Sequence, residues 1–194
     1  MQLADLDSVI RVHLSSFTGF FLSSMGTRFL KEFYKAALLD ESSIALVSQQ
    51  DNRISGLVVG TTQPSGFYRR VIRGHWHQFL LASTRLIVRK PQTILRLLWR
   101  LLITRNEKHY SGEALLMSIA VNPSDQGKGT GKQLVDRFIE EASRRGAASI
   151  SLTTDAINNK GVNEFYLRSG FDCSSSFMTP EGRQMNEYRR VLRQ

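Results

Sequence analysis

Apolar residues recur at helical spacing in four stretches of the chain, two near its start and two in its second half. Positions three and four residues apart lie on one face of a helix, so each stretch predicts a helix with one buried side. The predicted helices cover residues 4–17, about 29–38, 132–145 and 158–169. Asp5 and Asp7 suit the positive end of the first helix dipole, and Gly146 and Gly170 suit the ends of the last two helices.

Shorter apolar or alternating runs lie between these helices and predict strands. The predicted strands cover residues 43–49, 54–61, 115–121, 148–153, 171–177 and 185–192, the last two as a hairpin. The run from Leu115 to Val121 is broken only by Ser118, which is expected of a strand that is covered on both faces. A chain of 194 residues with these elements predicts one domain, residues 1–194, with a substantial core.

The middle of the chain differs from the rest in its charge. No Asp or Glu occurs between Asn52 and Asn106, whereas ten Arg and Lys residues do, so this segment accounts for the formal net charge of +9. Two helices are predicted here, over 75–90 and 92–105, because Pro91 interrupts a helical pattern. Arginines four residues apart give each helix a basic ridge, opposite a strongly apolar face.

Cysteine usage and the first residues bear on the location of the protein. Cys173 has no second cysteine to pair with, which fits a reducing cytoplasm, and a lone thiol of this kind is typically a small buried side chain. The N-terminal residues carry acids where a secretory signal carries basic residues. No uncharged run reaches the ~18 residues that span a bilayer. We therefore expect a soluble, cytoplasmic protein.

A glycine-rich loop joins the strand at 115–121 to the helix at 132–145. Its three glycines stand at alternate positions, Gly127, Gly129 and Gly131. Backbone N–H groups in such a loop can converge on an anion without interference from a Cβ atom, and the helix dipole adds to the attraction. Lys128 and Lys132 place positive charge at the same point. The order of strand, loop and helix therefore predicts a phosphate-binding site, although many glycine-rich loops are only turns.

Two sequence patterns, taken together, make this prediction specific. The first is Gln or Arg, two residues, Gly, one residue, then Gly or Ala, and it is filled by Gln126, Gly129 and Gly131. The second is Asn, six residues, Tyr, then a nearby Gly-Phe pair, and it is filled by Asn159, Tyr166 and Gly170-Phe171. With both patterns present, the chain resembles the GNAT superfamily of N-acetyltransferases over roughly residues 113–171.

The resemblance implies an α/β (α+β) fold with a mixed, mainly antiparallel central sheet. This sheet would splay at the acetyl-CoA site and carry helices on both faces. The helical insertion at about 75–105 is an addition to the minimal family fold. Family members usually begin with a strand before the first helix, but only Met1–Leu3 precede the acidic helix start here. That strand is expected to be missing or shortened.

The resemblance also implies acetyl-CoA as co-substrate, with no metal. Backbone N–H groups of the glycine loop would hold the pyrophosphate, and a bulged strand would bond to the pantetheine arm. The implied cofactor-binding residues are Ile119, Ala120, Val121, Gln126, Gly127, Lys128, Gly129, Thr130, Gly131, Lys132 and Asn159. Tyr166 would be the catalytic residue that protonates the leaving thiolate. An isolated tyrosine is by default a packed aromatic side chain, but the position of Tyr166, seven residues after Asn159 and four before Gly170, favours the catalytic role.

The acceptor side of the implied reaction is less defined. A neutral primary amine would attack the acetyl carbonyl, which backbone N–H groups near Ile119 or Ala120 would polarise. The expected carboxylate base is missing from the strand at 115–121. Other residues that could serve are Glu113, Asp155, His109, His75 and His77. Phe20, Phe21 and Leu22 either line the acceptor pocket or only join two helices.

The predicted function is acetyl-CoA-dependent N-acetylation of a small primary amine. The acid-free segment favours an anionic acceptor, such as a nucleotide-linked amino sugar. Two alternatives stay open, a protein or peptide N-acetyltransferase and a non-catalytic CoA-binding module. The basic insertion could be a lid over a phosphorylated acceptor, a peripheral membrane contact or a homodimer interface. Nucleic acid is not expected as a partner, because interleaved aromatic residues are sparse in this segment.

Overall fold

A six-stranded sheet forms the centre of the computed structural model, which describes residues 1–18, 21–89, 112–180 and 182–192. Its strand order is β1-β2-β3-β4-β6-β5. The strands are β1 (Ser43–Gln50), β2 (Arg53–Thr61), β3 (Glu113–Val121), β4 (Ser149–Asp155), β5 (Asp172–Met178) and β6 (Gln184–Val191). Neighbouring strands are antiparallel except β3 and β4, which run parallel. The predicted α/β fold with a mixed, mainly antiparallel sheet is confirmed.

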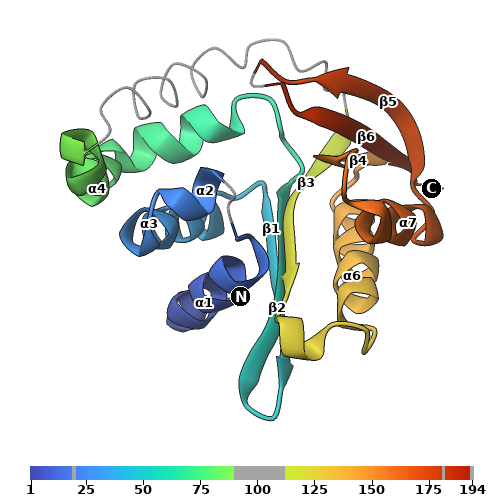
Figure 1. Ribbon diagram of the computed structural model, residues 1–194, viewed down its shortest axis with the longest axis horizontal. Coiled ribbons are helices and arrows are strands. Elements are labelled where there is room, and N and C mark those ends of the chain that lie inside the picture. The colour runs from blue at the N-terminus through green and yellow to red at the C-terminus, as the bar shows by residue number, and fades with distance from the viewer. Residues whose placement is uncertain (19–20, 90–111, 181, 193–194) are drawn as a thin grey trace.

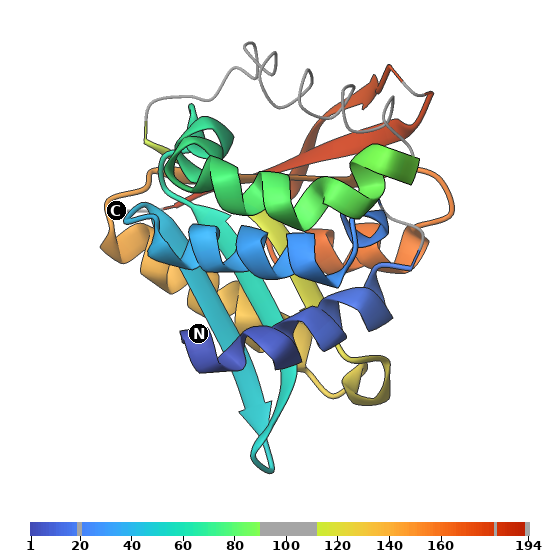
Figure 2. The ribbon, with the colours of Figure 1, turned by 90° about the vertical axis from the view of Figure 1, so that its left-hand side faces the viewer.

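Helices cover both faces of the sheet (Figures 1 and 2). One face carries α1 (Leu6–Ser16), α2 (Phe21–Ser24), α3 (Thr27–Leu39) and α4 (Phe67–Arg89). The other carries α6 (Thr130–Arg144) and α7 (Lys160–Arg168). Two short 3-10 turns are η1 (Leu3–Asp5) and η2 (Pro123–Asp125). The described residues ahead of β1 form helices and turns, so they contain no strand before the first helix.

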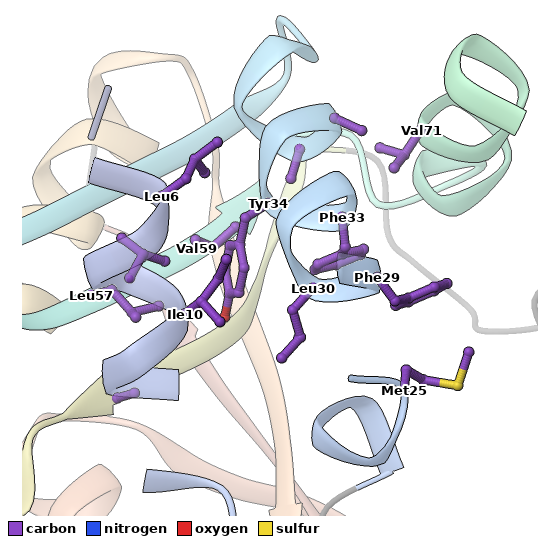
Figure 3. Close-up of a cluster of buried hydrophobic side chains, with 14 of the residues drawn as sticks. Leu6, Ile10, Met25, Phe29, Leu30, Phe33, Tyr34, Leu57, Val59 and Val71 are labelled. Carbon is purple, nitrogen blue, oxygen red and sulfur yellow. The ribbon is translucent and has the colours of Figure 1, made fainter. Parts of the chain in front are cut away.

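Strand β2 is buried on both faces, because successive side chains of a strand point to opposite sides of the sheet. Leu57 and Val59 belong to the core beneath α1 and α3, together with Tyr34 (Figure 3). Val58 belongs to the second core, together with Phe138 of α6. Strand β2 is therefore packed between two separate apolar layers, and its pairing with β3 fixes the position of β3.

Gly60 of β2 marks a close contact between the sheet and α6. A Cβ atom at this position would lie 2.3 Å from the carbonyl oxygen of Leu115 and 2.5 Å from the ring of Phe138. Real Cβ atoms do not approach backbone oxygens this closely, so the packing leaves room for glycine alone.

Strand β3 carries a bulge and separates from β4 part-way along its length. Val59 of β2 pairs with Ser118, but the next residue, Gly60, pairs with Leu116, so Met117 is an extra residue in β3. Pairing with β4 covers only Glu113–Leu115 of β3. The edge of β3 beyond Leu115 therefore has no ladder to β4, and the implied bulge and splay are both present.

The first helix of the basic segment begins earlier than the sequence predicts. Helix α4 starts at Phe67, not at His75, and its backbone bends at His75, where φ is −135° and ψ is 21°. Phe67, Val71 and Phe79 share its buried side at four-residue multiples, which explains why the helix extends across this stretch. The helix predicted over 92–105 lies outside the described residues. In the part of the chain that the structure describes, no helix is long and apolar enough to cross a membrane.

Three further expectations are corrected. The segment between the first two predicted helices, for which no helix was predicted, contains the short helix α2. Cys173 is exposed, not buried, because β5 is the edge strand of the sheet and all its residues are exposed to solvent. The continuous apolar run of β3 is also not fully covered, since several of its side chains are only half-buried.

Candidate functional site

A cavity of about 1080 Å³ lies where β3 and β4 separate. Every residue of β3 from Leu116 to Val121 lines this cavity. On one face of the sheet its walls come from the glycine loop, the start of α6, the end of β4 and α7. On the other face they come from α1, α2, α3 and α4. The half-buried side chains of β3 thus border a cavity that connects both faces of the sheet.

The glycine loop has the backbone conformation that the sequence pattern predicts. Gly127 and Gly129 have φ angles of +77° and +87°, in the left-handed region that favours glycine. Gly129 is the residue before helix α6, which begins at Thr130. The N–H groups of the first helical turn have no partners within the helix, so they are directed toward the loop and the cavity beyond it. This geometry suits an anion.

Asp125 fastens the base of the loop. Its side chain is 3% exposed, and its two carboxylate oxygens accept bonds from Lys128 Nζ at 3.0 Å and Arg53 Nη2 at 2.8 Å. The bond from Lys128 and the charges of both cations hold the pKa of the Asp125 carboxyl below its usual value. Lys128 therefore pairs with Asp125, and it does not line the cavity.

The other loop residues divide into two groups. Gln126, Gly127, Gly129, Gly131 and Lys132 line the cavity. Thr130 is buried, and its hydroxyl oxygen has no hydrogen-bond partner among the described residues. The side-chain amide of Gln126 donates to the Val121 carbonyl at 3.3 Å, which ties the loop to the end of β3.

The edge of β3 continues this site. Ile119, Ala120 and Val121 pair with β2 on one side and border the cavity, with no strand pairing to β4. The Val121 carbonyl also accepts a bond from Ser16 Oγ at 3.0 Å, which joins α1 to the strand end. An extended group could therefore lie against this edge as an added strand does.

Asn159 lies at the start of α7 and lines the cavity. Its side-chain amide donates to Thr154 Oγ1 at 2.8 Å and to the Asp155 carbonyl at 3.1 Å. These bonds anchor the beginning of α7 to the end of β4. The NH₂ group of Asn159 is thus already used within the protein.

Tyr166 of α7 lines the same cavity and is 5% exposed. Its ring packs against Phe165, Phe171 and Tyr188, with ring centroids 5.3, 5.9 and 5.8 Å away. Burial raises the pKa of the Tyr166 hydroxyl above its usual value, because the charged phenolate is poorly solvated there. The hydroxyl is therefore protonated at neutral pH and can act as a proton donor.

Most of the candidate bases from the sequence analysis lie in unsuitable places. Glu113 is buried beside Arg189, 3.2 Å from its Nε atom, and does not line the cavity. Asp155 lines the cavity but is bonded by both oxygens to Arg183. His75 and His77 of α4 lie outside the cavity lining, and His109 lies outside the described residues.

His13 of α1 is a titratable cavity residue that the sequence analysis missed. It is 3% exposed, and its Nδ1 atom lies 2.7 Å from the Tyr34 hydroxyl. Its Nε2 atom is buried and has no hydrogen-bond partner among the described residues. The sequence could have indicated that His13 is buried, because it stands four residues after Val9 and three after Ile10, on the apolar face of the helix.

Burial lowers the pKa of His13 from 6.5 to about 4, which predicts an acid-sensitive stability. The unfolded chain takes up a proton near pH 6.5 that the folded protein does not, so the free energy of unfolding should fall as the pH drops from 6.5 to 4. We expect a loss of about 2 kcal/mol across this range, reduced for partial solvent screening. Urea unfolding at several pH values measures it.

The matched variants are His13→Asn, which keeps a partner for Tyr34, and His77→Asn on the exposed side of α4. The first should flatten the dependence between pH 4 and 6.5, and the second should leave it unchanged. An equal slope in wild type and in His13→Asn would mean that other groups cause the loss.

Comparison with known proteins agrees with this geometry. Residues 95–171 match the sequence family described as acetyltransferase (GNAT). The matched residues make up less than half of the chain, and they include both sequence patterns that carry the resemblance. The resemblance inferred from the two sequence patterns is thereby confirmed, and the bulged, splayed β3 with its glycine loop is the candidate site within this fold.

Individual GNAT relatives are distant. An uncharacterised N-acetyltransferase from Methanocaldococcus jannaschii is 39% identical over 59 residues, which span 30% of this chain and 26% of that protein. A solved structure assigned to the GNAT family, from Desulfovibrio desulfuricans, has a TM-score of 0.64 at 18% identity, over 97% of this chain and 92% of that one. A ribosomal-protein-alanine N-acetyltransferase from Brucella melitensis has a TM-score of 0.65 at 12% identity, over 99% and 97%. These structures share the fold.

Proposed function

We propose that this GNAT protein transfers the acetyl group of acetyl-CoA to a primary amine by direct attack. The observation that carries the proposal is the single cavity that joins the glycine loop, the open edge of β3 and Tyr166. A donor bound along the loop and strand edge and an amine entering from the other face of the sheet would meet at the gap between β3 and β4. The residues fit acetyl-CoA as the donor.

The donor would be held mainly by backbone groups. N–H groups from Gln126 to Lys132 would bind the pyrophosphate at the start of α6. Lys132 lines the cavity and would add positive charge, whereas Lys128 would act indirectly by holding Asp125. The pantetheine arm would lie along the strand edge at Ile119–Val121. Asn159 would shape the opposite wall, because its own amide is bonded to β4.

The chemistry assigns two tasks to the protein. The amine nitrogen forms a bond to the acetyl carbonyl carbon while backbone N–H groups near Ile119 or Ala120 stabilise the charge on the carbonyl oxygen. The carbon–sulfur bond breaks, and Tyr166 donates its proton to the departing sulfur. Tyr166 regains a proton from solvent, and the proton lost by the amine goes to solvent. The products are the acetamide and free CoA.

Several finer assignments belong to this proposal. Residues 1–194 would act as one N-acetyltransferase domain in the cytoplasm. A protein or peptide acceptor is the main rival to a small amine, and a non-catalytic CoA-binding module is the second. A homodimer or membrane contact through the basic insertion stays a prediction, because most of that insertion lies outside the described residues. We propose no role for nucleic acid.

An acceptor panel tests the proposal by following the release of free CoA. The purified protein is given acetyl-CoA with small amines, a polyamine, an amino sugar phosphate and peptides with free N-termini. We expect turnover with at least one primary amine, and lower rates with longer acyl-CoAs. CoA binding measured by calorimetry, combined with no turnover on any acceptor, would favour the non-catalytic module.

A further inference from the structure

We propose that the half of the cavity beneath α1, α3 and α4 binds the uncharged, apolar body of the acceptor, so that the acceptor is an alkyl or aryl amine. The inference rests on the proposed function and names its substrate class. It follows from the chemistry of the walls on this face of the sheet, which differs from the chemistry around the glycine loop.

The walls on this face consist mainly of apolar and aromatic side chains. The apolar and aromatic residues that line it are Phe17, Leu22, Phe29, Phe33, Val71 and Phe79. Tyr68, Ile72 and Met117 complete it, with Met117 at the bulge where β3 meets the gap. Of the residues proposed from sequence as a pocket wall, Leu22 lies here, whereas Phe20 and the side chain of Phe21 lie outside the described structure. Such walls favour an apolar ligand body.

The described charged residues in the cavity lining do not come from α1, α2, α3 or α4. Among the described residues they are Lys132, Asp155, Arg168 and Arg183, which come from α6, the end of β4, α7 and the turn before β6. The polar side chains on the α1 face are those of His13, Ser16, Ser118 and Tyr68, and none of them carries a charge at neutral pH. An acceptor that packs against α1, α3 and α4 therefore meets no described charged side chain from these helices, and Asp155 and Arg183, at the strand ends, bond to each other.

The described arginines of the acid-free segment do not change this conclusion. Arg70 bonds to Asp40 at 3.0 Å, to Ser42 Oγ at 3.0 Å and to the Gln63 carbonyl at 2.9 Å, so it fastens α4 to the end of β2. Arg69 and Arg73 are exposed and absent from the cavity lining. An anionic acceptor was favoured because of this basic segment, but none of the segment's arginines whose side chains are described lines the cavity.

An apolar wall would also help the reaction. Only a neutral amine can attack the thioester carbonyl, and transfer of an ammonium group into carbon-lined surroundings lowers its pKa by desolvation. Part of the work of the unassigned base would thus be done by burial of the acceptor. The proton would leave to solvent before the bond to the acetyl carbon forms.

Unbranched alkylamines from propylamine to hexylamine test the proposal, because they share nearly the same basicity and differ only in apolar length. With saturating acetyl-CoA, kcat/KM should rise about fourfold for each added methylene, since a buried methylene contributes about 0.8 kcal/mol. Ethanolamine phosphate and glucosamine 6-phosphate should be at least tenfold poorer than hexylamine. Binding of hexylamine to the CoA-loaded protein is measured in parallel by calorimetry.

Two variants on opposite sides of α4 locate the effect. Ile72→Lys places a cation in the apolar wall and should abolish the increase with chain length, whereas Arg69→Ala on the exposed side should preserve it. Thermal unfolding shows whether both variants are folded. If one of them is unfolded, the dependence of the wild-type kcat/KM on alkylamine length tests the proposal by itself.

The outcomes separate this inference from the proposed function. Turnover that is independent of chain length, or is greatest with the phosphorylated amines, would overturn the inference and leave the acetyltransferase proposal intact. Binding of hexylamine without turnover would support the apolar acceptor pocket and overturn the acetyltransferase proposal. A kcat/KM for hexanoyl-CoA tenfold above that for acetyl-CoA would show that the apolar half holds the acyl chain, and it would also overturn the inference. If hexylamine neither binds nor reacts, both proposals fail.

Discussion

Replacement of Tyr166 by phenylalanine is expected to lower kcat about a hundredfold, with little change in the KM for acetyl-CoA. The substitution keeps the ring contacts with Phe165, Phe171 and Tyr188 and removes only the hydroxyl. Loss of a general acid costs about 10²–10⁴ in rate, and the lower end applies where water can reach the sulfur. Steady-state kinetics with a good acceptor measures the effect.

Tyr188→Phe is the matched control. Tyr188 is equally buried, its ring lies 5.8 Å from that of Tyr166, and its hydroxyl donates to Asn163 Oδ1 at 2.8 Å, away from the cavity lining. Its removal should cost about 1 kcal/mol of stability and leave kcat within about threefold. Unchanged kcat in Tyr166→Phe would show that Tyr166 is a packed aromatic side chain and not the acid.

Gly60→Ala should destabilise the protein strongly, by about 3 kcal/mol or more. The added methyl group would stand 2.3 Å from the Leu115 carbonyl oxygen and 2.5 Å from the Phe138 ring, and neither neighbour is the free end of a flexible side chain. Either β2 and β3 would move apart or α6 would lift from the sheet. The midpoint of urea unfolding measures the loss.

Gly74→Ala is the control for this prediction. Gly74 lies within α4, and a Cβ atom there meets no other atom within 4 Å. Alanine is favoured over glycine in a helix by about 0.8–1.0 kcal/mol, so this variant should be as stable as wild type or slightly more stable. Similar destabilisation by the two substitutions would mean that the close contact at Gly60 is not what requires glycine.

The donor half of the site was predictable from sequence because its determinants are local. Gly127 and Gly129 adopt positive φ within one loop, and the helix that follows begins at the next residue, Thr130. Asn159 and Tyr166 lie on one short helix, at spacings that a linear pattern can specify. The fold class and the cavity position of most of the proposed cofactor-binding residues agree with what these short stretches imply.

Local pattern failed where the outcome depends on a neighbour distant in sequence. The sequence did not indicate that Asp125, at the base of the glycine loop, pairs with Arg53, 72 residues away in the chain. It predicted a buried Cys173, but the strand order leaves β5 at the edge. It passed over His13, whose place in the cavity depends on α1 packing beside Tyr34 of α3.

The sequence by itself determined a mixed α/β fold, a glycine loop at a helix start and a tyrosine near it, because each depends on residues within one or two turns of chain. Only the tertiary structure decided that β3 bulges at Met117 and parts from β4 after Leu115, and that α1, α3 and α4 close the far side with apolar side chains. Strand register and helix docking are set by packing between segments far apart in the chain, such as Gly60 against Phe138. The spacing of residues within a single segment therefore does not predict strand register or helix docking.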